Sequence, residues 1–130
     1  MRIIVTGSRD WEGSWARNEV NGALALLRAL TVFLGEPMVL VHGACPTGVD
    51  FLVDEWAKTH PTVTVERHPA DWRKYGRAAG PRRNQEMVAL GAHMCIGFRK
   101  GGSTGTGHTL ALARHAGIPT FELLWKEERK

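Results

Sequence analysis

Residues 92–123, AHMCIGFRKGGSTGTGHTLALARHAGIPTFEL, hold the pattern that decides the fold. A mostly apolar run at 92–98 leads into a loop that packs four glycines into seven positions, 101–107. A helical pattern follows over about residues 107–116, and the short run PTFEL comes shortly after its terminating glycine. Strand, glycine loop, helix and strand in this order indicate one unit of a parallel sheet, in which the helix crosses back over one face.

The rest of the chain repeats this alternation. We expect strands at residues 2–6, 38–42 and 62–67, helices at about 14–34, 47–60 and 81–90, and a polar connection at 68–80. Apolar strands that alternate with helices form a parallel sheet with helices on both faces, because each crossover is right-handed. The sequence therefore predicts one α/β domain over residues 1–130, a three-layer sandwich around a five-stranded parallel sheet of order 3-2-1-4-5.

Composition narrows the class of protein. A chain of 130 residues has room for one core. The two cysteines, Cys45 and Cys95, are too few for a disulfide framework and match no zinc spacing, so we expect small buried side chains and no bound metal. No apolar run approaches the roughly 18 residues of a membrane span, and the N-terminus has no signal sequence. We therefore expect a soluble protein of the cytoplasm.

The predicted sheet order fixes the place of a ligand site. The chain leaves the first strand in one direction and returns on its other side at the fourth, which opens a crevice between their carboxyl ends. TGSRDW follows the first strand and RKGGSTGTGH follows the fourth. Gly7, Ser8 and Arg9 would form one wall, while the second loop offers glycine N–H groups and hydroxyls at a helix N-terminus. The residues that would hold a phosphate there are Gly102, Ser103, Thr104, Gly105 and Thr106.

A basic segment supplies positive charge to the same crevice. Residues 67–83 contain six basic side chains and one acidic side chain, whereas the whole chain has a formal net charge of +4. If Pro81 opens a helix, Arg82 and Arg83 lie in its first turn, where positive charge opposes the helix dipole unless an anion binds. We therefore expect both arginines, with the adjacent Asn84, to serve a ligand rather than the fold.

The loop after the second predicted strand, HGACPTGVD, is a third candidate wall. Gly43 follows the strand, and Asp50 lies in the first turn of the next helix, where a carboxylate stabilises the dipole or binds a hydroxyl group. A P-loop is excluded because Lys100 precedes the glycines, and a dinucleotide fingerprint is excluded because the loop after the first strand has one glycine. We therefore expect an anion site without hydride chemistry, and no cofactor.

Four segments together resemble the branch of the SLOG superfamily related to YspA and YpsA. They are RIIVTGSRDW, VHGACPTGVDFLVDEWA, HPADWRKYGRAAGPRRNQEMV and GGSTGTGHTLALARHAGIP, and they span nearly the whole chain. The resemblance implies a Rossmann-like domain, related to the Lonely-guy phosphoribohydrolases and to the DNA-processing protein DprA, with short members in bacteria and their phages. It also implies a nucleotide or nucleotide-derived signalling molecule as the ligand, and it favours a homodimer.

Two motifs of the Lonely-guy enzymes are matched only in part. RRNQEM resembles one of them in Arg83 and Met87 but has Asn84 in place of lysine, and GGSTGTGH has His108 where the other leads to glutamate. Cleaving an N-glycosidic bond needs a carboxylate to stabilise the developing oxocarbenium charge, and histidine offers no fixed negative charge. The catalytic residues of such an enzyme stay unassigned, with Asp10, Asp50 and Asp71 as the nearest acidic side chains.

Three functions remain open from the sequence. The leading prediction is a domain that binds a nucleotide or nucleotide-derived ligand at the crevice. The alternative is a phosphoribohydrolase that acts on nucleoside monophosphates. A nucleic-acid-binding module is the third, because Trp72 and Tyr75 interleave with the basic side chains of residues 67–83. For Trp72 itself we expect a place in the core.

Overall fold

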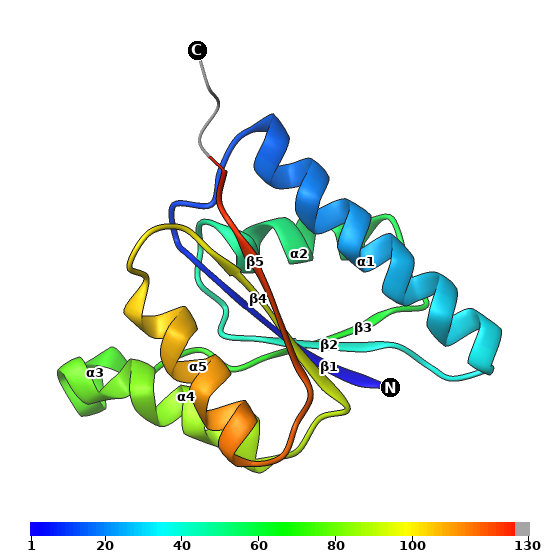
Figure 1. Cartoon of the computed structure of the whole chain (residues 1–130). Helices are drawn as coiled ribbons and strands as arrows, with labels where there is room; N and C mark the ends of the chain where they lie inside the picture. Colours follow the sequence, from blue (N-terminus) through cyan, green and yellow to red (C-terminus); the bar gives the residue numbers. More distant parts are fainter. Residues whose placement is uncertain (127–130) are drawn as a thin grey trace.

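A computed structural model describes residues 1–126 of the chain as a parallel sheet between helices (Figure 1). The strands are β1 (Arg2–Gly7), β2 (Val39–His42), β3 (Thr64–Arg67), β4 (Met94–Arg99) and β5 (Thr120–Leu124). All neighbouring strands pair in parallel, and their order is β3-β2-β1-β4-β5. The predicted sheet and its order are confirmed.

The helices cover both faces of the sheet, as expected. They are α1 (Ser14–Leu34), α2 (Val49–Lys58), the short α3 (Trp72–Tyr75), α4 (Ala79–Ala89) and α5 (Thr104–His115), with a 3₁₀ turn, η1 (Gly76–Ala78), between α3 and α4. Figure 1 shows α1 and α2 on one face and α4 and α5 on the other. The predicted three-layer sandwich is therefore confirmed. No helix within residues 1–126 is long and apolar enough to cross a membrane.

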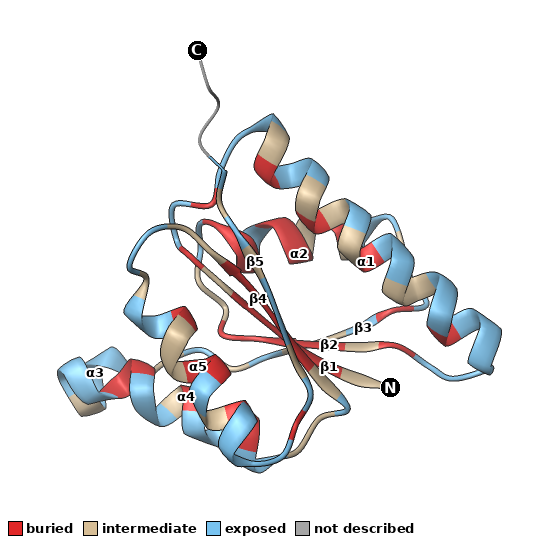
Figure 2. Ribbon diagram, in the orientation of Figure 1, coloured by how far each residue is buried: buried red, intermediate tan, exposed pale blue. Residues whose placement is uncertain are grey.

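Alternate residues of the central strands feed two separate cores. Ile3 and Val5 of β1 pack with Val20 and Leu24 of α1 in the first core. The intervening Ile4 belongs to the second core, which α4 and α5 complete. Figure 2 shows the central strands as buried while the outer faces of the helices are exposed. Because both faces of β1 are buried, its sequence is a continuous apolar run instead of an alternating one.

The starts of α4 and α5, which border the carboxyl edge of the sheet, differ from the sequence prediction. The segment expected as an irregular connection contains α3, whose start is capped by the Asp71 side chain accepting from the Lys74 N–H at 3.1 Å. Helix α4 consequently begins at Ala79, so Pro81 does not open it and Arg82 and Arg83 lie beyond its first free N–H groups. Helix α5 begins at Thr104, three residues earlier than expected, because its first turn tolerates glycines whose low helix propensity had indicated a loop.

Candidate functional site

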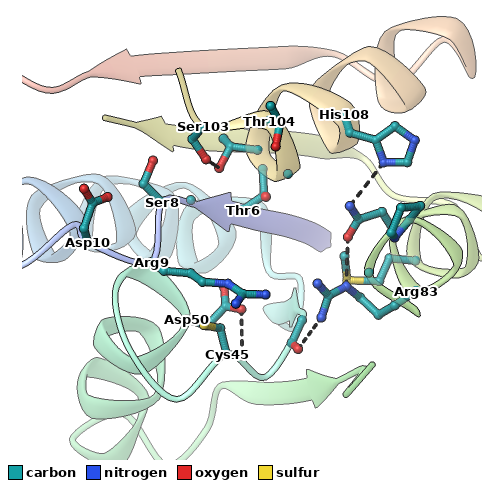
Figure 3. A pocket seen from close by; sticks show the side chains of 18 of the residues that line it. Thr6, Ser8, Arg9, Asp10, Cys45, Asp50, Arg83, Ser103, Thr104 and His108 are labelled. Carbon is teal, nitrogen blue, oxygen red and sulfur yellow. Dashed lines mark hydrogen bonds between the residues drawn. The ribbon is translucent and has the colours of Figure 1, made fainter. Parts of the chain in front are cut away.

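A cavity of about 760 Å³ lies at the carboxyl ends of β1 and β4, at the predicted switch point (Figure 3). All but one of the predicted site residues line it, namely Gly7, Ser8, Arg9, Gly43, Asp50, Arg83, Asn84, Gly102, Ser103, Thr104, Gly105 and Thr106. The exception is Arg82, whose guanidinium lies 4.2 Å from the centre of the Tyr75 ring. Arg82 is exposed outside the cavity because successive residues of a helix point about 100° apart, so Arg82 and Arg83 face different sides of α4.

The loops after β1 and β4 are joined to each other at the cavity wall. The Ser8 N–H donates to the Phe98 carbonyl at 2.9 Å, and the Lys100 N–H donates to the Ser8 hydroxyl at 2.8 Å. Gly7 is required for packing here, since a Cβ atom would lie 2.1 Å from the Val49 side chain at the start of α2. Gly48 has φ +72°, a conformation that favours glycine, and a Cβ atom there would collide with the Ser8 carbonyl oxygen. These contacts fix the wall that contains Ser8.

The N-terminus of α5 forms the opposite wall and carries free hydrogen-bond donors. Ser103 occupies the position before the helix but makes no side-chain cap, and its hydroxyl instead donates to the Thr106 hydroxyl at 3.1 Å. The N–H groups of the first helical turn have no carbonyl partner within the helix. A Cβ atom at Gly105 would meet nothing within 4 Å, so the space beside this backbone is open. Such an arrangement suits a phosphate group.

Arg83 is held by the protein itself, which the sequence did not predict. Its Nη1 donates to the carbonyls of Gly43 and His68, and its Nε donates to Asn84 Oδ1 at 2.8 Å. Burial lowers the pKa of Arg83 from its ordinary value, and the Asp50 carboxylate opposes this shift. The expectation that Arg83 serves only a ligand is therefore wrong, because its guanidinium also ties α4 to the loop after β2. Within the described residues Nη2 has no hydrogen-bond partner and remains available to a ligand.

Asp50 closes the loop that carries Gly43 and Cys45. Its Oδ2 accepts from the Cys45 N–H at 3.0 Å, and burial raises the pKa of the Asp50 carboxyl group although His42 lies 4.0 Å away. His42 is buried, and its Nε2 hydrogen-bonds Asp54 at 2.7 Å while its Nδ1 accepts from the Ala44 N–H at 2.9 Å. Ala44 has φ +58°, so these hydrogen bonds hold a loop conformation that alanine rarely adopts.

Asn84 links the two helices that meet at the cavity. Its side chain is buried, accepts from Arg83, and lies with Nδ2 3.2 Å from Nδ1 of His108 on α5. An Nδ1 that accepts from Asn84 leaves the proton on Nε2, so His108 offers a donor N–H from α5. Asn84 therefore stands between a cation and an imidazole, a role that an amide fills because it accepts through its oxygen and donates through its nitrogen.

Comparison with known proteins identifies the family. A family model described as YAcAr, the YspA and cpYpsA-related SLOG family, matches residues 1–75. The chain belongs to this family. It is also 40% identical over 124 residues to the Gene 61 protein of Mycobacterium phage D29, covering 92% of this chain and 94% of that protein. No solved structure matches the chain. In this SLOG domain α4, β4 and α5 lie beyond the matched residues 1–75.

The cavity of the SLOG domain also contains residues that the sequence prediction missed. Cys45, Arg77 and Lys100 line it. Trp72 was expected in the core, but half of it is exposed, it lines the cavity, and its ring lies 5.6 Å from the Arg9 guanidinium carbon. The prediction for Trp72 is wrong because α3 turns this ring toward Gly80 and the cavity instead of the sheet. The expectation for the cysteines holds for Cys95, which is fully buried, and not for Cys45, which is partly exposed.

Proposed function

We propose that this SLOG domain binds a nucleotide or nucleotide-derived small molecule in the switch-point cavity, with a phosphate group at the N-terminus of α5. The observation that carries the proposal is the uncapped first turn of α5 beside the open face of Gly105. Free N–H groups and the positive end of the helix dipole together favour a phosphate. Ser8 and the partly exposed Lys100 face the same space from the β1 and β4 loops.

A base or sugar would occupy the far side of the cavity. Trp72 offers a half-exposed aromatic ring there. Aromatic rings stack against any nucleobase, because every base has a π-face. The cavity volume of about 760 Å³ lies in the range of about 300–1,000 Å³ that is typical of small-molecule sites. A ligand with a phosphate at α5 and a base near Trp72 therefore fits both ends of the cavity.

The charges around the cavity support an anionic ligand. Arg9 and Arg77 line it, and neither has an acidic partner among residues 1–126. Asp50 offsets part of this charge, but it is buried and already accepts from the Cys45 N–H. A phosphate would bring the missing negative charge to the two arginines.

We infer binding without turnover as the leading function. Of the acidic side chains that line the cavity, Asp10 is largely exposed and lies 3.9 Å from the Lys100 ammonium, and Asp50 is engaged by the loop. His108 occupies the position of the expected glutamate and carries no fixed negative charge. A phosphoribohydrolase would need one of these two aspartates to stabilise the sugar cation.

A thermal-shift screen followed by chromatography tests both functions. The purified protein is mixed in turn with AMP, ADP-ribose, NAD and cyclic nucleotides. We expect at least one of them to stabilise the fold, by about 2.7 kcal/mol at 100 times its dissociation constant, and to be recovered intact. Release of free base from AMP would show that the protein is a hydrolase and not only a binding domain. A screen in which no nucleotide stabilises the fold would contradict the proposal.

A second candidate, nucleic-acid binding, rests on the outer surface of α3 and α4. Arg73, Lys74 and Arg82 are exposed there and form no ion pair within the described part of the chain. Trp72 and Tyr75 lie among them, and Arg82 and Lys74 stack over the Tyr75 ring. Titration with a single-stranded oligonucleotide at several salt concentrations measures this function, which predicts a steep loss of affinity as salt rises.

A further inference from the structure

One oxygen of the Asp50 carboxylate has no partner in the protein. Asp50 lies in the first turn of α2 and is 8% exposed. Its Oδ2 accepts from the Cys45 N–H at 3.0 Å, whereas its Oδ1 has no hydrogen-bond partner within residues 1–126. Oδ1 still reaches open space, because in this part of the chain the fully enclosed polar side-chain atom without a partner is Arg99 Nε. Since Asp50 lines the cavity, its Oδ1 is available to a ligand there.

The groups around Asp50 are engaged elsewhere and leave this oxygen free. Arg83 points its Nη1 at two backbone carbonyls and forms no ion pair with Asp50 within the described residues. His42 lies 4.0 Å from Oδ2, and its two ring nitrogens are already bonded to Asp54 and to the Ala44 N–H. A buried polar atom without a partner costs free energy. We therefore expect a ligand in the cavity to bring a donor to Oδ1.

A hydroxyl group is the donor that suits Oδ1 best. A phosphate would be repelled by the carboxylate, and the edge of a nucleobase presents adjacent groups that need two partner atoms, whereas Oδ2 is already taken by the loop. Burial raises the pKa of Asp50, although the charges of His42 and Arg83 oppose the shift. A hydroxyl donates to an ionised carboxylate and accepts from a protonated one, so it binds Asp50 in both states.

The position of Asp50 relative to the phosphate site fits a sugar. Figure 3 shows Asp50 across the cavity from Ser103 and Thr104, with Thr6 at the end of β1 between them. In the sheet β1 separates β2 from β4, and two strand spacings amount to roughly 10 Å. A 5′-phosphate and the hydroxyls of its ribose span this distance with a hydrogen bond of about 3 Å at each end.

We propose that Asp50 determines which sugar the cavity accepts, because its Oδ1 accepts a hydrogen bond from a ribose hydroxyl of the ligand. The inference rests on the proposed phosphate site and adds the class of sugar bound beside it. A nucleotide without ribose hydroxyls would cover Oδ1 and leave it unpaired, and a site with such an unpaired group rejects the analogue. The cavity therefore selects ribonucleotides over dideoxynucleotides.

Calorimetric titration of the full chain with AMP and with 2′,3′-dideoxy-AMP tests this inference without altering the protein. The two compounds share the base and the 5′-phosphate, so the ratio of their dissociation constants isolates the two hydroxyls. Loss of one hydrogen bond to a charged group should make dideoxy-AMP bind on the order of 10- to 150-fold more weakly. Equal affinities for the two compounds would overturn the inference and leave the phosphate site in place.

Variants separate recognition by Asp50 from its support of the loop. Asp50→Ala should bring the ratio close to one, and Asp50→Asn, which keeps an acceptor for the Cys45 N–H, should lower it several-fold and decides the matter if the alanine variant does not fold. Asp54→Asn is the matched control, because Asp54 belongs to the same helix but does not line the cavity, and it should keep the wild-type ratio. If both Asp50 variants weaken the two compounds equally, Asp50 only supports the loop and the inference is wrong.

Titration with inorganic pyrophosphate separates failure of this inference from failure of the proposed function. A protein that binds pyrophosphate but not AMP would keep its phosphate site, and the inference would be overturned because the ribose contributes no affinity. If neither pyrophosphate nor AMP binds, the phosphate site itself is wrong and the inference fails with it.

Discussion

The charged side chains at the β3 edge of the sheet and those at the cavity rim are arranged in opposite ways. At the β3 edge, Glu66 accepts from the Arg2 guanidinium at 2.8 and 2.9 Å and from His68 at 2.7 Å. At the rim, Arg9 and Arg77 have no acidic partner within residues 1–126. Arg2 and His68 at the edge are therefore satisfied by the fold, whereas Arg9 and Arg77 at the rim are left for something outside it.

This difference indicates which charges the domain keeps for function. Unpaired charges of one sign repel each other, and in a bare protein they bring no stability. The pKa of Arg83 is lowered mainly by burial, and the Asp50 carboxylate opposes this shift. The positive charge of the nearby Arg9 guanidinium lowers the pKa further. A site that keeps such repulsion is expected where an anion relieves it. The comparison predicts that rim substitutions change binding, while edge substitutions change stability.

The largest effect is expected at Gly105, which has no charge but borders the free donors of α5. Gly105→Val places a branched side chain in the space where a phosphate would lie, so we expect nucleotide affinity to fall by about 100-fold or more. The melting temperature of the free protein should change little, because no atom lies within 4 Å of the added Cβ. Ala111→Val, on the exposed side of the same helix, is the control. If folded Gly105→Val protein keeps full nucleotide affinity, the phosphate does not bind beside Gly105.

Arg83 is the one cation of this set that both stabilises the fold and lines the cavity, so its substitution should change stability as well as binding. Arg83→Ala removes a charge-assisted contact worth about 1.5–3 kcal/mol, so affinity should fall on the order of 10- to 150-fold. The free protein should also lose about 1–3 kcal/mol, because the carbonyls of Gly43 and His68 lose their donor. Calorimetric titration and chemical denaturation measure the two losses.

The neighbouring Arg82 is the matched control for Arg83, because it carries the same charge outside the cavity. Arg82→Ala should leave both quantities nearly unchanged. Equal losses in the two variants would mean that net charge, rather than the position of Arg83, controls binding.

Arg77→Ala sharpens the contrast between the rim and the rest of the surface. We expect affinity to fall by roughly 3- to 10-fold at low salt and by less at high salt, since an exposed charge is screened. Stability should stay within about 0.5 kcal/mol of the wild type. Arg114→Ala removes the same charge from an arginine that faces Glu122 at 3.7 Å, and it should leave affinity unchanged. If Arg77→Ala and Arg114→Ala weaken nucleotide affinity equally, net charge rather than position at the rim controls binding.

The smallest effect is expected at the β3 edge. Hydrogen bonds from Arg2 and then from His68 lower the pKa of Glu66 to about 2 from its ordinary value of 4.5. A lowered pKa in the folded state adds stability that is complete above pH 4.5 and is lost as the pH falls toward 2. Glu66→Gln should therefore cost at most about 1 kcal/mol at pH 7 and flatten the acid side of the stability profile. If the stability of Glu66→Gln falls between pH 4.5 and 2 as steeply as that of the wild type, this assignment is contradicted.

Most of the fold could be predicted because burial and chain direction leave a visible pattern. The run Ile3 to Val5 is apolar at every position since both faces of β1 are covered, and this feature distinguishes a central parallel strand. The start of α5 was missed because Gly105 and Gly107 have low helix propensity, yet the first turn of a helix tolerates them. The position of Ala79 at the start of α4 depends on α3, a helix of one turn with little periodicity to detect.

The candidate site was predictable in its location and less so in the roles of its members. The sheet order alone brings Ser8 and Thr104 to one crevice, although they are far apart in the chain. The hydrogen bond of Arg83 to the Gly43 carbonyl joins residues 40 positions apart, and no local pattern indicates it. The exposure of Trp72 likewise depends on how α3 is turned against α4. Such tertiary contacts decide whether a polar or aromatic side chain faces the ligand or the protein.

Amide chemical shifts of the isotopically labelled protein, followed by NMR during titration with AMP and then with inorganic pyrophosphate, test the central claim most directly. The account predicts that the backbone N–H signals of Thr104, Gly105 and Thr106 move saturably with both compounds, together with that of Ser8. Signals from the second half of α1 should not move, because that surface lies away from the cavity. If the amides of the first turn of α5 stay in place while others move, or if neither compound shifts any signal, the phosphate site is not where we place it.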